Sequence, residues 1–156
     1  MSSSSHHHTF VIERDIAAPP ELAFLAWSDK DAKDVWFRGP DDWQALEQHF
    51  DFREGGSERV KGRFPSGKTS DFQCQYRDIV PNRRIVYTYD MFVDDKRISV
   101  SVATVEFAPA AGGTRLKLTE QVVHLDGYPT PEDREEGTAW LVGKAVAYIE
   151  GHLAKA

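Results

Sequence analysis

The strongest constraint on the fold is a series of segments, from about Trp43 to Val123, in which apolar and polar residues alternate. Alternation with a period of two is typical of strands that bury one face and leave the other in water. The glycine pair at residues 55–56, the segment 65–68 and the glycine pair at residues 112–113 interrupt the series as hairpin turns. Because strands joined by tight turns pair antiparallel, this region predicts roughly five or six antiparallel strands.

Helical patterns flank these strands on both sides. A strand pattern over residues 9–16 comes first, and the two prolines before Glu21 predict a short helix, followed by a second one at residues 31–37. Near the other end, Thr130 precedes a proline and two acidic residues, and a broad apolar stripe continues toward Ala156. We therefore expect an α+β fold in which a curved antiparallel sheet wraps around a long C-terminal helix, with two short helices after the first strand.

The segment 97–107 is a strand whose alternation changes phase. Val100 and Val102 fall on one face, whereas Val105 and Phe107 fall on the other. A β-bulge adds one residue to a strand and shifts its alternation by one position. We therefore expect a bulge or a strong local twist within this segment.

Composition and charge exclude several classes of protein. The 156 residues carry 19 basic and 25 acidic side chains, a net charge of −6, without the clustered basic face that binds nucleic acid. No apolar run approaches the ~20 residues of a membrane helix, and residues 1–8 lack the apolar core of a signal peptide. Cys74 is alone, so no internal disulfide forms. We expect a cytoplasmic protein with one domain over residues 9–156, after a disordered or tag-like segment at residues 1–8.

Several segments, in this order along the chain, carry a family likeness. They are RDIAAPP (14–20) with AWSD (26–29), WF (36–37), FDFREGG (50–56), YRDIVP (76–81) with RIVY (84–87), GGTRLKLT (112–119) and EGTAW (136–140). With them the chain resembles the SRPBCC (START-like, helix-grip) superfamily. Within it, the chain is similar to the family of homologues of the activator of the ninety-kilodalton heat-shock protein's ATPase. The resemblance implies a sheet that grips the C-terminal helix around a ligand cavity, but it implies no particular reaction.

Strand phase predicts which side chains line that cavity. The expected lining combines apolar residues, three tyrosine hydroxyls, one glutamine and one glutamate. These residues are Trp36, Phe37, Gln48, Phe50, Phe52, Phe72, Cys74, Tyr76, Tyr87, Tyr89, Met91, Leu118, Glu120 and Trp140. A few convergent polar groups on an apolar surface are typical of a ligand site. The alternatives are that these residues only pack a core, or that a register slip of one position turns them outward.

Glu120 is the candidate catalytic residue. If its carboxyl group faces the cavity, it could act as an acid or base together with Tyr76, Tyr87 or Tyr89. If it lies at the end of its strand, it reaches water or pairs with an arginine. No metal site is expected, because no natural histidine has a second His or Cys at ligand spacing. Cys74 lies on an apolar face and is expected to behave as a small hydrophobic residue.

Three functions follow from these observations. The first is binding of a small hydrophobic or aromatic ligand, with no cofactor. The second is a co-chaperone-like role, in which the outer surface binds a heat-shock chaperone. The third is a cyclase- or hydrolase-type enzyme that uses Glu120 and a cavity tyrosine. An exposed edge strand would permit a homodimer as well as a monomer. We also expect Trp140 to lie buried under the sheet, so that its replacement by alanine destabilises the fold by roughly 3–5 kcal/mol.

Overall fold

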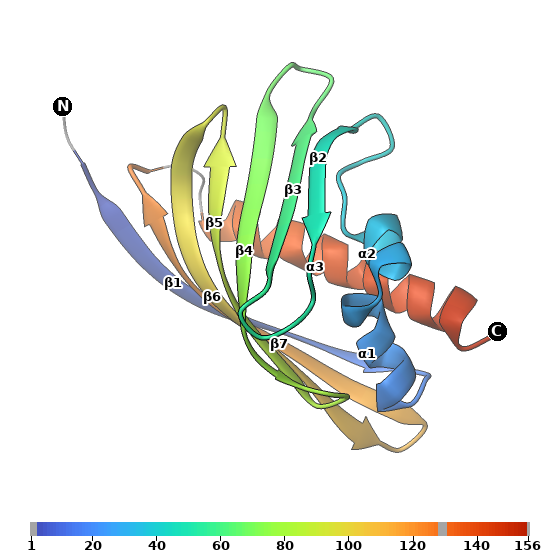
Figure 1. Cartoon of the computed structure of the whole chain (residues 1–156). Coiled ribbons are helices and arrows are strands. Elements are labelled where there is room, and N and C mark those ends of the chain that lie inside the picture. The colour runs from blue at the N-terminus through green and yellow to red at the C-terminus, as the bar shows by residue number, and fades with distance from the viewer. Residues whose placement is uncertain (1–2, 128–130, 156) are drawn as a thin grey trace.

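A seven-stranded antiparallel sheet curves around one long helix (Figure 1). The computed structural model describes residues 3–127 and 131–155. The strands lie in the order β1-β7-β6-β5-β4-β3-β2, so that β1 returns to pair with the last strand. They are β1 (Ser5–Ile16), β2 (Gln44–Phe50), β3 (Ser57–Arg63), β4 (Thr69–Val80), β5 (Arg84–Val93), β6 (Lys96–Ala110) and β7 (Gly113–Leu125). The fold predicted from the sequence pattern and the resemblance is confirmed.

Two short helices follow β1, as the sequence predicts: α1 (Pro20–Ser28) and α2 (Lys30–Trp36). The side chain of Asp29 accepts a hydrogen bond from the backbone N–H of Ala32 at 3.0 Å, which satisfies a free donor in the first turn of α2. Because Asp29 also ends α1, the two helices are separate elements joined by a single residue. They pack at one end of the sheet beside the long helix (Figure 1).

The long helix, α3 (Pro131–Tyr148), crosses the concave side of the sheet and continues into η1 (Ile149–Leu153), a π-helical turn (Figure 1). Thr130, the expected cap, lies outside the described residues. The stripe that α3 and η1 bury is centred on Val142, Ala145 and Ile149. Leu141 and Tyr148, which flank this stripe, are half-buried. Within the described residues, no helix is long and apolar enough to cross a membrane.

The expected bulge in β6 lies at Ile98. Ser99 pairs with Met91 on β5, but Arg97 already pairs with Phe92, so Ile98 is the extra residue. Ile98 and Ser99 are consequently both buried, and the inward face of β6 then continues through alternate residues toward Phe107. The phase change seen in the sequence has a different cause, because alternation is regular from Ser99 to Phe107: Val100 and Val102 are apolar residues on the outer face, whereas Val105 and Phe107 are buried.

Strand β1 begins at Ser5, ahead of the expected start at Thr9. The backbone of Ser5 pairs with Leu125 and that of His8 with Val122, so residues 5–8 extend the edge of the sheet. The described part of the segment expected to be disordered or tag-like therefore includes strand residues.

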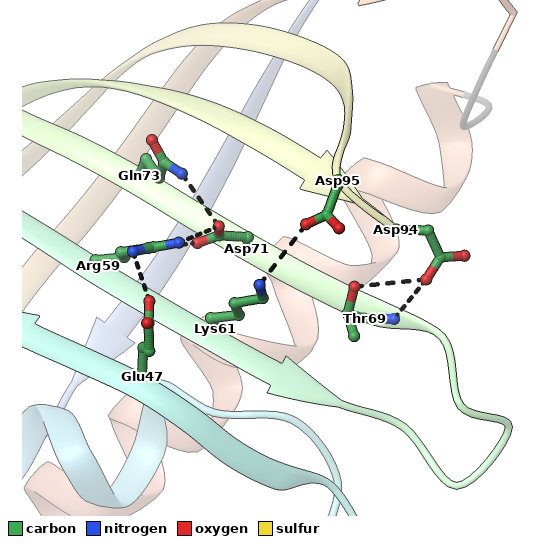
Figure 2. Close-up of polar contacts among 8 residues, drawn as sticks. All are labelled: Glu47, Arg59, Lys61, Thr69, Asp71, Gln73, Asp94 and Asp95. Carbon is green, nitrogen blue, oxygen red and sulfur yellow. Dashed lines mark hydrogen bonds and ion pairs between the residues drawn. The ribbon is translucent and has the colours of Figure 1, made fainter.

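The outer face of β2, β3 and β4 is charged (Figure 2). Arg59 donates two hydrogen bonds to Asp71, of 3.1 and 2.8 Å, and forms an ion pair with Glu47. Asp71 also accepts a bond from Gln73 at 3.1 Å. The residue next to Asp71 in β4, Phe72, belongs to the buried core, so β4 carries charge outside and aromatic surface inside.

Candidate functional site

A cavity of about 420 Å³ lies between the sheet, α3 and the segment after α2. Aromatic and aliphatic side chains form most of its wall, with Trp27 of α1, Trp43 before β2 and Leu141 of α3 among them. Trp43 fills space left by two glycines, since a Cβ atom at Gly39 or Gly62 would overlap its ring. The wall is therefore built by packing between distant segments, and the two glycines set its shape near Trp43.

Most of the predicted lining residues do line this cavity. They are Trp36, Phe37, Phe72, Tyr87, Tyr89, Met91, Leu118, Glu120 and Trp140. The three from β5 are successive inward-facing positions, as are the two from β7, because alternation is regular along these parts of both strands. Sequence phase predicts such positions well where a strand is paired on both sides.

The remaining predicted residues lie elsewhere. Gln48 is exposed, and Gln48 and Phe50 line a separate, smaller cavity of about 170 Å³ beside α2. The register of β2 shifts between Ala45 and Glu47, and β2 is an edge strand covered by α2 rather than by α3. Phe52 follows the end of β2 and packs against the core.

Cys74 and Tyr76 of β4 belong to the buried core and do not reach the large cavity. Burial, together with the nearby Glu58 carboxylate, raises the pKa of the Cys74 thiol to about 12. This thiol therefore remains protonated at neutral pH, as expected for a cysteine that acts as a small hydrophobic residue.

Trp140 corrects one expectation. It borders the cavity, but 47% of its surface is exposed, so it is not buried under the sheet. Its ring lies 4.4 Å from Nζ of Lys144, one turn along α3. The buried stripe of α3 runs through Val142 and Ala145, and Trp140 projects to the side of that stripe, at the mouth of the cavity.

Glu120 is the centre of a buried polar cluster in the cavity wall. Its Oε2 accepts hydrogen bonds from the Tyr89 hydroxyl at 2.7 Å and the Ser101 hydroxyl at 3.0 Å. The Nη1 of Arg134 lies 3.4 Å from the same oxygen and 3.2 Å from the Tyr89 hydroxyl, while Nη2 donates to Ser99 Oγ at 2.7 Å. We call Tyr89, Ser99, Ser101, Glu120 and Arg134 the polar cluster.

The strand register brings the polar cluster together. Tyr89 on β5 pairs with Ser101 on β6, and Glu120 on β7 pairs with Ala103 on β6. The small side chains of β6 leave room for the two longer ones to meet above it. Burial, reinforced by the Glu120 carboxylate, raises the pKa of the Tyr89 hydroxyl. Tyr89 therefore keeps its proton and acts as a hydrogen-bond donor.

Arg134 was missed by sequence reasoning. It stands among four acidic residues at the start of α3, in a pattern typical of a solvated helix end. In the structure its side chain is buried and paired with Glu120. The available signal was the acidic residue expected in the cavity, which needs a cation when buried.

A second buried ion pair was also missed. Lys33 of α2 binds Glu58 of β3, and the Tyr76 hydroxyl donates to the same carboxylate oxygen. Burial and the Glu58 carboxylate raise the pKa of Tyr76. This group borders the smaller cavity, which Lys33 and Glu58 help to line.

His124 on β7 is buried, and neither ring nitrogen has a hydrogen-bond partner among the described residues. Burial is the main reason that its pKa is lowered to about 4, and the Arg134 guanidinium adds to the effect. His124 is therefore neutral at pH 7.

The sequence and the fold are similar to those of known proteins. The sequence model of a family described as activator of Hsp90 ATPase homolog 1-like protein matches residues 17–152. A solved structure of an uncharacterized protein from Rhizobium leguminosarum is 41% identical, with a TM-score of 0.93 over 97% of this chain and 100% of that chain. A Rhizobium loti protein is 38% identical, with a TM-score of 0.85 over 92% of this chain and 98% of the other.

The same fold extends to more distant bacterial proteins. The AHSA1-like protein from Aeromonas hydrophila is 22% identical, with a TM-score of 0.69 over 92% of this chain and 93% of that chain. No curated protein matches the sequence at a significant level. These similarities agree with the resemblance drawn from the sequence segments.

Proposed function

The chain belongs to the activator of Hsp90 ATPase homolog 1-like family, and we propose that it binds a small hydrophobic or aromatic ligand between its sheet and α3. The observation that carries this proposal is the apolar cavity of about 420 Å³ with the buried polar cluster in its wall. Small-molecule sites are typically concave, largely apolar and roughly 300–1,000 Å³ in volume, with a few polar groups that orient the ligand. Aromatic rings would supply most of the affinity through buried apolar area.

A pair of glycines on α3 offers a sharp test of the proposal. A Cβ atom at Gly137 or Gly143 meets no heavy atom within 4 Å, but Gly137 lines the cavity and Gly143 does not. Leucine at either position should favour the helix, because glycine costs about 0.5–1 kcal/mol there. Gly137→Leu should obstruct ligand entry, whereas Gly143→Leu is the matched control.

The measurement is a thermal-shift screen against lipids, sterols and uncharged aromatic compounds. A ligand at 100 times its Kd adds about 2.7 kcal/mol to the unfolding free energy, which raises Tm by roughly 5–10 °C in a domain of this size. We expect one chemical class to give such a shift in the wild type and in Gly143→Leu, and a much smaller one in Gly137→Leu. A flat screen, or equal shifts in both variants, would count against a ligand site in this cavity.

A second candidate function is protein binding, as the family description suggests for an activator of a chaperone ATPase. Exposed valines on the outer face of β1 and β6 favour it: Val11, Val100 and Val102 are each more than one-third exposed. Val100 pairs with Val123 on β7, which extends the apolar surface of β6 onto that strand, whereas Thr119 of β7 is the partner of Val11. Such surface is available to a protein partner.

The test of this candidate uses a purified bacterial Hsp90-type chaperone. The protein should stimulate its ATPase, and the variant Val102→Asp should lose the stimulation, while Gln44→Asp on β2, an exposed position at the opposite edge of the sheet from β1, serves as a control for added charge. Lack of stimulation by the wild type would reject this function.

Acid–base catalysis by Glu120 has less support than binding. Its Oε2 is already engaged by Tyr89, Ser101 and Arg134. Groups held in this way are better suited to orienting a ligand than to transferring protons. If Glu120→Gln abolished turnover of a bound ligand while binding persisted, the enzymatic function would gain support instead.

A further inference from the structure

We propose that the polar cluster selects an uncharged ligand that donates a hydrogen bond, from a hydroxyl or amide N–H group, to Oε1 of Glu120. This inference rests on the proposed function, because it names the chemistry of the ligand in the same cavity. It is carried by the charge balance of the cavity wall and by the polar atoms there that lack partners.

The charges in the cavity wall balance one another. The side chains of Glu120 and Arg134 are only 2% and 8% exposed and form an ion pair. The other charged residues of the wall, Arg38 and Asp133, again have opposite signs. Arg38 is half-buried and Asp133 exposed, so the buried charges of the wall are those of Glu120 and Arg134, which already pair with each other. A charged ligand group beside them would find no unpaired buried counterion, and burying an unpaired charge is costly. An uncharged ligand avoids this cost.

The hydrogen bonds of Glu120 are one-sided. Those from the described residues all end on Oε2, and none of these residues donates to Oε1. Among the described residues, Oε1 is not one of the fully buried atoms without a partner, so it reaches the open space of the cavity. A ligand that displaced water from Oε1 without donating a hydrogen bond would leave a buried unpaired acceptor, which costs free energy, whereas a ligand donor avoids that cost. Ligand groups that donate, such as hydroxyl or amide N–H, fit this position.

Tyr87 supplies a second open polar group in the same wall. It neighbours the polar cluster through Tyr89, the next inward residue of β5, and its ring centroid lies 6.0 Å from that of Tyr89. No hydrogen bond joins its hydroxyl to any residue that the structure describes, and burial raises its pKa well above the ordinary value. The Tyr87 hydroxyl is thus a protonated donor that can also accept, which suits a ligand hydroxyl or amide.

Two other ligand classes fit less well. A carboxylate could bind Arg134, but it would stand beside the Glu120 carboxylate and be repelled by it. An ether or hydrocarbon would leave Oε1 of Glu120 without a donor. The polar cluster therefore discriminates between ligands with the same apolar skeleton and different end groups.

The test uses three probes on one skeleton: biphenyl-4-ol, 4-methoxybiphenyl and biphenyl-4-carboxylate. Binding to the full chain is measured at pH 7 by titration calorimetry. We expect biphenyl-4-ol to bind about tenfold or more tightly than each of the other two, as the loss of a hydrogen bond to a charged group implies. Equal or tighter binding of the methyl ether or the carboxylate would overturn the inference and leave the proposed function intact. Absence of binding by all three would overturn the proposed function and, with it, this inference.

Variants then test whether Glu120 sets the preference. Glu120→Gln keeps the size of the side chain but leaves Arg134 without its counterion, so the ratio of affinities should shift at least about tenfold toward the carboxylate probe. Asp71→Asn, which removes a carboxylate from the outer face, should leave the ratio unchanged. An unchanged ratio of affinities in a folded Glu120→Gln variant would overturn the role of Glu120. If that variant does not fold, the three probes on the wild-type protein still test the ligand preference.

Discussion

The Nζ atom of Lys33 on α2 lies 2.7 Å from Oε1 of Glu58 on β3, and both side chains are buried. The ammonium group also lies over the ring of Phe37, 4.2 Å from its centroid. The Tyr76 hydroxyl donates to the same Glu58 oxygen. This ion pair therefore ties α2 to the sheet, next to the segment that closes the large cavity.

Removing the cation should destabilise the fold strongly. Lys33→Met leaves the Glu58 carboxylate buried with only the Tyr76 hydroxyl as a partner. An uncompensated buried charge of this kind costs about 3–5 kcal/mol, so the unfolding free energy from urea denaturation should fall by that amount. Lys30→Met on the same helix is the control, because the ion pair of Lys30 with Asp34 is exposed and its loss should have no measurable effect. Equal effects of the two variants would contradict the structural role of Lys33.

Two tryptophans near the cavity should respond differently to truncation. Trp36 is 3% exposed, packs on Trp27 and donates from Nε1 to the carbonyl of Ala26 at 2.7 Å. Trp36→Ala should cost about 3–5 kcal/mol of unfolding free energy. Trp140→Ala should cost less than about 1 kcal/mol, because Trp140 is nearly half exposed. Urea denaturation of both variants is the check, and a large loss for Trp140 alone would place it in the core instead.

The fold was predictable because its signals are local. Alternation marked the strands and glycine pairs marked the turns, but the apparent phase change near Val102 came from exposed valines and not from the bulge at Ile98. Each of these depends on the period of a strand or the geometry of a turn, which neighbouring residues determine. The inward positions of β5 and β7, including Tyr89 and Glu120, followed from the same period.

The polar partners were not predictable in this way. Arg134 and Lys33 are buried because each forms an ion pair with a carboxylate that is distant in the sequence. The residues next to each of them in the sequence do not indicate which carboxylate that is. Gln48 was misplaced because β2 is an edge strand with a register shift, where period alone does not identify the covering element. The burial of Trp140 was predicted wrongly, because a broad apolar stripe on a helix does not show which of its residues face the sheet and which lie at its exposed margin.

The outer face of the sheet provides a test of a partly buried carboxylate (Figure 2). Burial would raise the pKa of Asp71, but hydrogen bonds from Arg59 and Gln73 outweigh it and hold the pKa below its ordinary value. Because the folded state has the lower pKa, the carboxylate stabilises the fold above the ordinary value of about 3.9, and this contribution is lost as the pH falls below it.

Asp71→Asn should therefore lower the unfolding free energy at pH 7 by about 1–3 kcal/mol, and the difference from wild type should shrink in acid. Asp95→Asn is the matched control, since Asp95 is largely exposed and its nearest cation, Nζ of Lys61, is 3.6 Å away. Chemical denaturation at pH 7 and pH 3 measures both. A difference for Asp71→Asn that grew at low pH would reverse the assigned sign.

His124 should make the fold sensitive to mild acid. Its pKa is about 4 in the folded state against an ordinary value of 6.5, because it is buried and because Arg134, His6 and His8 disfavour its charge more than Glu132 favours it. Between these two values the unfolded chain binds a proton that the folded chain does not. The unfolding free energy should therefore fall as the pH drops from 6.5 to about 4, by a total of about 3 kcal/mol from this group, and this contribution should be constant outside that window.

The variant His124→Leu isolates this contribution, because leucine cannot bind the proton. The slope of unfolding free energy against pH, measured by urea denaturation at intervals from pH 4 to pH 7, should be smaller in His124→Leu than in wild type. His49→Leu, which replaces an exposed histidine on β2, should retain the wild-type slope. If His124→Leu kept the full slope, the loss of stability in acid would belong to other groups, such as the carboxylates. A reduced slope would instead show that acid acts on the fold at β7, through a side chain beside Arg134 and therefore beside the polar cluster.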